Sequence, residues 1–442
     1  MYLATIGRPK SGTDAGERLD TGERADTGEP GRRRWTAVGG NVVALGAVSL
    51  VTDVSAEMVT AILPLYLVVG LHFGPVAYGA VDGVYTGATA LLRLIGGYVA
   101  DRIHRRKAVA GVGYGISAFA KLGLLAAGGS ATAIGMVIAA DRTGKGLRTA
   151  PRDALITLST PPGALGRAFG VHRAMDSMGA FAGPLVALAV LAAAGQTFDA
   201  VFATSFCIAA MGVVILVLFV NDHHSDNPPA VCDNPSPAAV SSRAALGLLR
   251  QSGVRRLLSA ACLLGLATIG DGFIYLLLQR SENLAIGWFP LFAVGTSGVY
   301  LLSAAPLGAL ADRIGRVPML LGGYAALIAI YLLLFGPLSG WLLIGVTLVL
   351  HGIFYAATDG ILMALAGPVL PEQLRTTGIA LIQSGQALAY LASSVLFGVA
   401  WHVWGPSGAS RMAAAAALIA MLATAILLAD RSSPHDSAEA AT

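Results

Sequence analysis

About twelve apolar stretches, each long enough to cross a lipid bilayer, follow one another along this chain of 442 residues. A helix needs roughly 20 apolar residues to cross the hydrocarbon layer. Hydrophobic residues make up 55% of the chain and charged residues only 12%, against about 25% in an ordinary soluble domain. The stretches lack the two-residue alternation of a membrane β-barrel, and helices satisfy their own backbone polar groups in lipid. The sequence therefore predicts an all-α membrane protein.

The expected spans form two sets of six. A segment rich in Pro, Ser and Asn separates the sets and is typical of a flexible linker, while the first residues hold too few apolar groups to fold. We expect spans at 40–70, 76–100, 107–128, 131–158, 166–194 and 199–220, and at 255–279, 288–311, 317–336, 340–367, 376–401 and 408–429. The expected domains are a disordered cytoplasmic tail (1–35), a six-helix bundle (36–220), a cytoplasmic linker (221–252), a second six-helix bundle (253–430) and a cytoplasmic tail (431–442).

Charge placement predicts the orientation. If both termini are cytoplasmic, most Lys and Arg residues fall in the inner connections. The opposite connections at 70–75, 128–131, 195–199 and 336–340 contain neither residue type. This asymmetry predicts a multi-pass protein of the cell inner (plasma) membrane with both termini cytoplasmic. The net charge of +4 then reflects orientation, so we expect no nucleic-acid partner.

One charged motif occurs twice between apolar spans, as Gly97-x-x-x-Asp101-Arg102 and as Gly308-x-x-x-Asp312-Arg313. Two related six-helix halves suit a carrier that opens a central site alternately to either side. Both copies resemble the signature between helices two and three, and eight and nine, of the major facilitator superfamily (MFS). The resemblance implies the MFS fold of twelve transmembrane helices in two pseudo-symmetric six-helix bundles. It also implies a cytoplasmic gate at these six residues; the alternative is that they only cap a tight loop and anchor it at the lipid surface.

Two further motifs resemble parts of the same superfamily. Arg142 with Gly146 is similar to a helix-four motif that the family links to proton coupling. Gly179, Gly183 and Pro184 are similar to the helix-five signature of antiporter-type exporters. A Gly-x-x-x-Gly pair also permits close helix packing whatever the direction of transport.

Acidic residues in the first span are candidates for the coupling chemistry. Asp53 and Glu57 are four residues apart and share one helical face near mid-depth. Carboxylates at this depth face a partner or a wet cavity, and burial disfavours the charged form of a carboxyl group. Either acid is therefore a candidate to bind and release a proton; the alternative is a fixed ion pair with a base on another helix.

Charged residues are concentrated in the first half of the chain. In the fourth span, the spacing of Asp141, Lys145, Arg148 and Arg152 predicts one inward-facing stripe, with Asp82 and Lys121 on neighbouring spans as possible partners. The second half is more apolar. The remaining candidates for the coupling site or cavity are Arg142, Asp153, Asp176, Asp271 and Asp359, with Tyr275, Phe354, Tyr355, Gln383 and Gln386 as substrate contacts.

These features favour a proton-coupled secondary transporter that works by alternating access and exports small organic molecules by antiport. The alternative is a proton symporter that imports an anionic metabolite, which the bases Lys145, Arg148 and Arg152 would suit. A membrane-embedded enzyme is a remote third reading, because the chain lacks an ATP-binding Gly-x-x-x-x-Gly-Lys-Ser/Thr loop and a His-Glu-x-x-His metal pair. We expect a monomer in the lipid bilayer with a small-molecule substrate, no metal and no cofactor, driven by the proton gradient.

Overall fold

The structure, a computed structural model, describes residues 39–87, 106–161, 164–222, 247–358, 361–366, 369–370 and 375–429. All regular structure in these ranges is helical. The first half contains α1 (Gly40–Leu65) with a π-helical turn η1 (Tyr66–Gly70), a helical segment at 75–87, α3 (Arg106–Ala126), α4 (Ala131–Leu158), α5 (Leu165–Ala193) and α6 (Phe198–Phe219). The second half contains α8 (Ser252–Ala267), α9 (Asp271–Ser281), a 3-10 turn η3 (Ile286–Trp288), α10 (Phe289–Ile314), α11 (Arg316–Leu333), α12 (Gly340–Thr358), α13 (Ile361–Ala366) and α14 (Arg375–Ala429).

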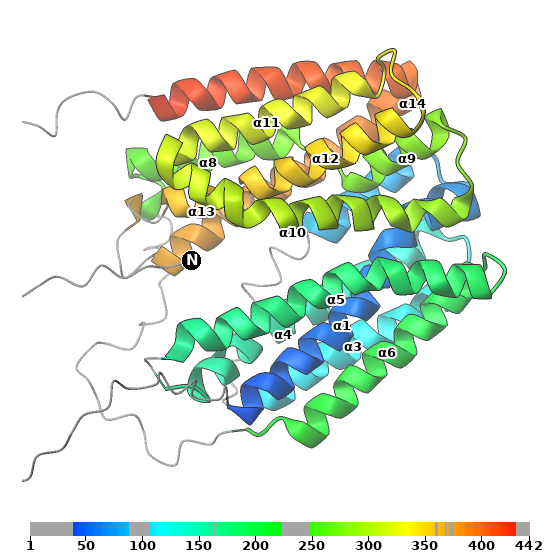
Figure 1. Cartoon of the computed structure of the whole chain (residues 1–442), viewed down its shortest axis with the longest axis vertical. Coiled ribbons are helices and arrows are strands. Elements are labelled where there is room, and N and C mark those ends of the chain that lie inside the picture. Colours follow the sequence, from blue (N-terminus) through cyan, green and yellow to red (C-terminus); the bar gives the residue numbers. More distant parts are fainter. Residues whose placement is uncertain are drawn as a thin grey trace, which may run out of the picture.

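The helices form two groups that follow the two halves of the sequence (Figure 1). In the first half, α1 packs against α5 and α6, and α3 packs against α4 and α6. In the second half, α14 packs against α8 and α11, and α12 packs against α10 and α11. Contacts between the halves join α5 to α10, and α1 to α9 and α10. The predicted all-α membrane fold is confirmed.

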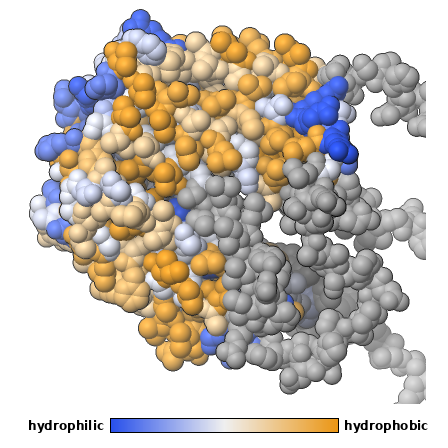
Figure 2. Space-filling model, turned by 180° about the vertical axis from the view of Figure 1, so that it is seen from behind, coloured by the Kyte–Doolittle hydropathy of each residue, from blue (hydrophilic) through white to orange (hydrophobic). Residues whose placement is uncertain are grey.

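The long axes of the helices define two ends of the molecule. We call the end with residues 71–74, 194–197, 282–285 and 334–339 the loop end, and the opposite end, where α1 begins and α14 finishes, the tail end. A broad apolar surface lies between them, with hydrophilic residues gathered at the margins (Figure 2). In the described part of the chain, nine helical stretches have the length and apolar character to cross a bilayer.

Three predicted spans have a different form in the structure. The predicted span 255–279 is divided, because α8 ends at Ala267 and α9 begins at Asp271. The Tyr331 hydroxyl donates to the carbonyl of Ala267 and accepts from the backbone N–H of Ile269, so it satisfies backbone groups that the missing helical turn leaves open. The last two spans form α14, whose direction reverses at Gly405, where φ is 71° and Pro406 follows.

Glycines set the closest helix contacts inside the first half. A side chain at Gly179 or Gly183 of α5 would collide with α1, whose backbone oxygen of Val54 lies 2.8 Å from the Cβ position of Gly183. A side chain at Gly144 of α4 would collide with α3, where the backbone N of Ser117 lies 2.8 Å away. Small residues let helix backbones approach closely in membranes. These contacts bring the charged face of α4 against α3 and the acidic face of α1 against α5.

A second set of glycines joins the two halves near the loop end. Gly79, Gly83 and Gly87 lie four residues apart on one face of the helical segment 75–87. The Cβ position of Gly83 is 3.0 Å from the backbone oxygen of Leu391 in α14, and Gly79 approaches the backbone of Ser394 still more closely. Any larger residue on this face would push the halves apart. This glycine face therefore closes the loop end in the observed conformation.

We predict that Gly83→Leu opens the loop end. Spin labels on Ala193→Cys and Trp341→Cys, which are exposed near the loop end of opposite halves, should show a longer distance population in the variant than in the parent. Gly115→Leu is the matched control, because nothing lies within 4 Å of its Cβ position. An unchanged distance distribution in Gly83→Leu would contradict the assigned role of the glycine face.

Candidate functional site

A cavity of about 1080 Å³ lies between the two halves. Its wall comes from α1, the segment 75–87, α4 and α5 on one side, and from α8 to α12 and α14 on the other. Five charged residues contribute to this wall, namely Glu57, Asp82, Lys145, Arg173 and Asp271. Arg173 is exposed and lies toward the tail end of α5. A site shared by both halves is the arrangement that alternating access requires.

Behind this wall, α4 and α3 hold a buried charge cluster centred on Asp141. Lys121 Nζ lies 2.6 Å from Asp141 Oδ1, and the Ser117 hydroxyl donates to the same oxygen over 2.5 Å. Arg142 forms a salt bridge with the second carboxylate oxygen, and its guanidinium lies 3.9 Å from the centre of the Tyr85 ring. Each buried charge in this cluster has a partner of opposite charge. An unpaired charge in such low-dielectric surroundings would be strongly destabilising.

A second charge cluster lies nearer the tail end. Arg148 Nη2 is 3.4 Å from Asp53 Oδ1. Arg152 donates to Asp153 over 3.0 Å and lies 3.9 Å from Asp176. The cluster thus pairs its acids with bases across α1, α4 and α5, and none of its members lines the cavity.

Glu57 and Lys145 differ from the residues of both clusters in their position and in their lack of partners. Both line the cavity, and they influence each other electrostatically. Neither has a hydrogen bond or a salt-bridge partner within 4.0 Å among the described residues. Gly183 allows α5 to lie against the Cβ of Glu57. Arg173 also has no such partner among the described residues, but it is exposed, whereas Glu57 and Lys145 are half-buried. Within the described part of the chain, the half-buried wall of the cavity thus presents one carboxyl group and one ammonium group without a protein partner.

In the second half, a chain of hydrogen bonds holds Asp271. The Tyr355 hydroxyl donates to Asp271 Oδ1 over 2.6 Å, and His351 Nε2 lies 3.3 Å from the same oxygen. His351 Nδ1 is 3.5 Å from the Thr296 hydroxyl, which in turn accepts from Tyr275 over 2.9 Å. Because His351 is buried and has partners on both ring nitrogens, it fixes α12 to α9 and α10.

Asp82 connects the two halves. It lies on the segment 75–87 and accepts hydrogen bonds from Ser394 over 2.6 Å and from Tyr390 over 3.2 Å, both in α14. Its carboxylate also lies directly against Gly270, where a side chain would collide with it. The break between α8 and α9 therefore gives Asp82 room to reach the opposite half.

The residues predicted for the site fall into three groups. Glu57, Lys145 and Asp271 line the cavity, as do the contact candidates Tyr275, Phe354, Tyr355, Gln383 and Gln386. The clusters behind the wall hold Asp53, Asp141, Arg142, Arg148, Arg152, Asp153 and Asp176. Gly97, Asp101, Arg102 and Asp359 lie outside the described residues.

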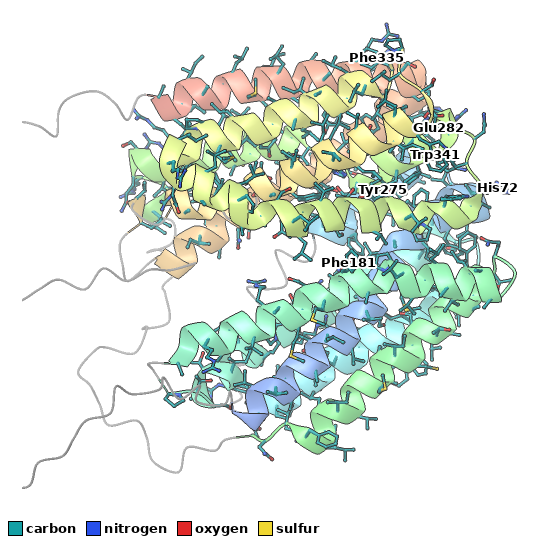
Figure 3. All side chains as sticks on the ribbon, in the orientation of Figure 1. His72, Phe181, Tyr275, Glu282, Phe335 and Trp341 are labelled. Carbon is teal, nitrogen blue, oxygen red and sulfur yellow. The ribbon has the colours of Figure 1, made fainter. Side chains whose placement is uncertain are left out.

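The two predicted motifs that are described lie elsewhere. Gly308, Asp312 and Arg313 are exposed on the last turns of α10 at the tail end. Gly179 and Gly183 form the contact with α1, and Pro184 lies within α5. Figure 3 shows Phe181 of the same helix at the boundary with α10, where its ring lies 3.7 Å from the Cβ position of Gly298.

The local sequence pattern indicates neither the contact of His351 with Asp271 nor the contact of Asp82 with the second half. Their partners are distant along the chain, at 80 and 312 residues, so no local pattern indicates them. A histidine within an otherwise apolar run was the only available signal for His351. Among the described residues, no group of His, Cys, Asp and Glu side chains is arranged to hold a metal ion.

Comparisons with known proteins agree on a transporter. The model of the Major Facilitator Superfamily matches residues 45–296 and 273–442. An uncharacterized MFS-type transporter, MJ1317 of Methanocaldococcus jannaschii, is 29% identical over 375 residues, which cover 82% of this chain and 89% of that protein. The uncharacterized protein Rv2265 of Mycobacterium tuberculosis is 37% identical over 162 residues, which cover 36% of this chain and 38% of the relative.

Solved structures share the fold. The nucleoside transporter NupG superposes with a TM-score of 0.70 at 15% identity, covering 87% of this chain and 98% of that one. A bacterial homologue of the human lysosomal transporter Spinster, in an inward-facing and occupied conformation, gives a TM-score of 0.65 at 14% identity, covering 89% and 96%.

We predict that Asp141→Asn lowers the free energy of unfolding by about 3–5 kcal/mol, because it leaves two buried bases without their countercharge. Asp153→Asn is the matched control, since the Asp153 side chain is 43% exposed and such pairs contribute about 1 kcal/mol or less. Denaturant titration in mixed micelles measures both. Equal losses in the two variants would contradict the structural role assigned to the Asp141 cluster.

Proposed function

Since the chain belongs to the Major Facilitator Superfamily and is a membrane transporter, we propose that it exports a small organic molecule across the plasma membrane in exchange for protons. The observation that carries this proposal is the uncommitted carboxyl group of Glu57 in the wall of the cavity between the halves. The proton gradient supplies the energy, the protein acts as a monomer and no cofactor takes part.

The closed loop end and the position of the cavity support an alternating-access cycle. The glycine face of the segment 75–87 and the hydrogen bonds of Asp82 hold the halves together at the loop end. At the tail end, Asp312 and Arg313 are exposed and bind no other described residue. With the basic tail end placed in the cytoplasm, this conformation is the one that receives substrate from inside the cell.

Competition at Glu57 favours antiport. A buried carboxyl group that lines a cavity is stabilised either by a proton or by a bound cation, and it cannot hold both in one place. A cationic group on the substrate would therefore displace the proton when it binds from the cytoplasmic side. After the halves rock to open the loop end, a proton from outside would displace the substrate. Each cycle then moves substrate outward and a proton inward.

Asp53 has a supporting role in this scheme. It lies one helical turn from Glu57 on α1 and joins α1 to Arg148 of α4. Asp53 does not line the cavity, so substrate has no direct access to it. We assign Asp53 to the coupling between α1 and α4, and we assign the exchange of proton for substrate to Glu57.

Import of an anionic metabolite with protons is the second candidate, because Lys145 faces the cavity. The other two bases that motivated this alternative have protein partners: Arg148 pairs with Asp53, and Arg152 pairs with Asp153. The sequence suggested three bases for an anionic substrate. In the half-buried wall of the cavity, Lys145 lies without a partner among the described residues and Glu57 offsets its charge, so the support for an anionic substrate is weaker. An enzymatic role has no support from the family, whose members transport their substrates.

We predict that the protein dissipates a pH gradient only when a transported amine is present. In everted vesicles with an acidic lumen, adding an organic amine from a screening panel should collapse part of the gradient reported by a pH-sensitive dye. Glu57→Gln should abolish this response. Glu282→Gln is the matched control, because Glu282 lies at the loop end (Figure 3) and only accepts from the backbone N–H of Gly340.

The same assay separates the two directions. A symporter would not dissipate the gradient when substrate is added outside everted vesicles, since its proton and substrate move together. Absence of a response across the panel, or an undiminished response in Glu57→Gln, would remove proton antiport at Glu57 from consideration.

A further inference from the structure

We propose that the cavity selects zwitterionic aromatic molecules, with Glu57 binding the substrate's ammonium group, Lys145 binding its carboxylate, and the aromatic second-half wall binding its body. This inference rests on the proposed transport function and adds the chemical class of the substrate. It concerns binding in the conformation described, so it can be tested without any proton gradient.

The five charged groups in the cavity wall differ in whether neighbouring protein groups already stabilise their charge. Asp82 accepts hydrogen bonds from Ser394 and Tyr390, so its charge is already stabilised. Asp271 accepts from Tyr355 and lies beside His351. Arg173 is exposed near the tail end of α5, so its charge is less removed from solvent than those of the half-buried groups.

Glu57 and Lys145 remain, and neither has a partner within 4.0 Å among the described residues. Both are half-buried in the cavity wall, and charged groups partly removed from water are stabilised by a countercharge. The two groups form no salt bridge with each other, because no N–O distance between them is 4.0 Å or less. A ligand that carries one positive and one negative group can supply a countercharge to both at once.

Singly charged ligands leave one group unmatched. A cation at Glu57 would leave Lys145 without a countercharge and would remove the negative neighbour that partly offsets its charge. An anion at Lys145 would do the same to Glu57. A zwitterion therefore gains an additional charge-assisted hydrogen bond relative to either matched ion.

The cavity wall on the second half carries aromatic side chains. Tyr275, Tyr324, Phe354 and Tyr355 all line the cavity. Phe354 contacts Tyr324 and Tyr355, with ring centroids 5.4 and 5.3 Å apart, so these rings form one continuous surface. Aromatic rings bind other aromatic groups through edge-to-face and offset contacts. The cavity thus combines two opposite charges on the first half with an aromatic surface on the second half.

The test uses matched triplets of ligands on one aromatic body. In the first triplet, phenylalanyl-phenylalanine is the zwitterion, its C-terminal amide is the cation and its N-acetyl form is the anion. The second, smaller triplet consists of phenylalanine, its amide and its N-acetyl form. Thermal stabilisation of the purified full-length protein in detergent, titrated with each ligand at one neutral pH, gives the affinities. In at least one triplet, the zwitterion should bind at least about tenfold more tightly than either singly charged relative.

Single substitutions should change this preference in separate ways. Lys145→Gln should reduce the affinity for the zwitterion to that for the amide, and Glu57→Gln should reduce it to that for the N-acetyl form. Phe354→Ala should weaken all three ligands alike. Lys107→Gln and Glu282→Gln should preserve the zwitterion preference, because both residues lie outside the cavity wall and bind backbone groups.

Three results would overturn the substrate class. They are equal binding of amide and zwitterion, a zwitterion preference that survives Lys145→Gln, and the absence of binding by every member of both triplets. If any of these occurs while everted vesicles still show amine-dependent dissipation through Glu57, proton antiport stands and only the substrate class is wrong. If zwitterion binding is found without such dissipation, the proposed coupling is wrong and the binding site stands.

Discussion

The cost of placing charge in a low-dielectric region governs how this molecule is built. Deep charges in the first half are paired: Asp141 with Lys121 of α3 and with its neighbour Arg142 in α4, and Asp53 of α1 with Arg148 of α4. These pairs join α1, α3 and α4, so the charges that are costly to bury also fix the arrangement of the helices. Against this paired background, Glu57 and Lys145 line the cavity without a partner among the described residues, and we propose that they serve a proton and a substrate.

Glycine contacts make the charge pairing geometrically possible. Gly144 brings α4 close enough to α3 for Asp141 to reach Lys121, and Gly183 brings α5 against α1 beside Glu57. The same principle acts between the halves, where the glycine face of segment 75–87 lets Asp82 reach α14. The helix-five glycines therefore have a packing role that is independent of transport direction, and our proposal of antiport rests on Glu57.

The sequence predicted the helices well because a membrane span needs a long apolar run, as the close agreement of α4 (Ala131–Leu158) with 131–158 shows. It also identified the charged stripe of α4, since helical spacing is local information. The break before Asp271 was not predictable, because the hydroxyl of Tyr331 replaces the missing helical bonds from 62 residues away. The pairing of each charge depends on helix packing in the same way, so only the structure separates Glu57 and Lys145 from their paired neighbours.

Proton release on ligand binding tests the central claim most directly, namely that substrate and proton compete for Glu57. Purified protein in weakly buffered detergent solution is mixed with a ligand that stabilises it, and a pH indicator records the protons released. The account predicts that the wild-type protein releases a proton on binding and that Glu57→Gln binds ligand without release. Binding without proton release in the wild type, or equal release in Glu57→Gln, would contradict it.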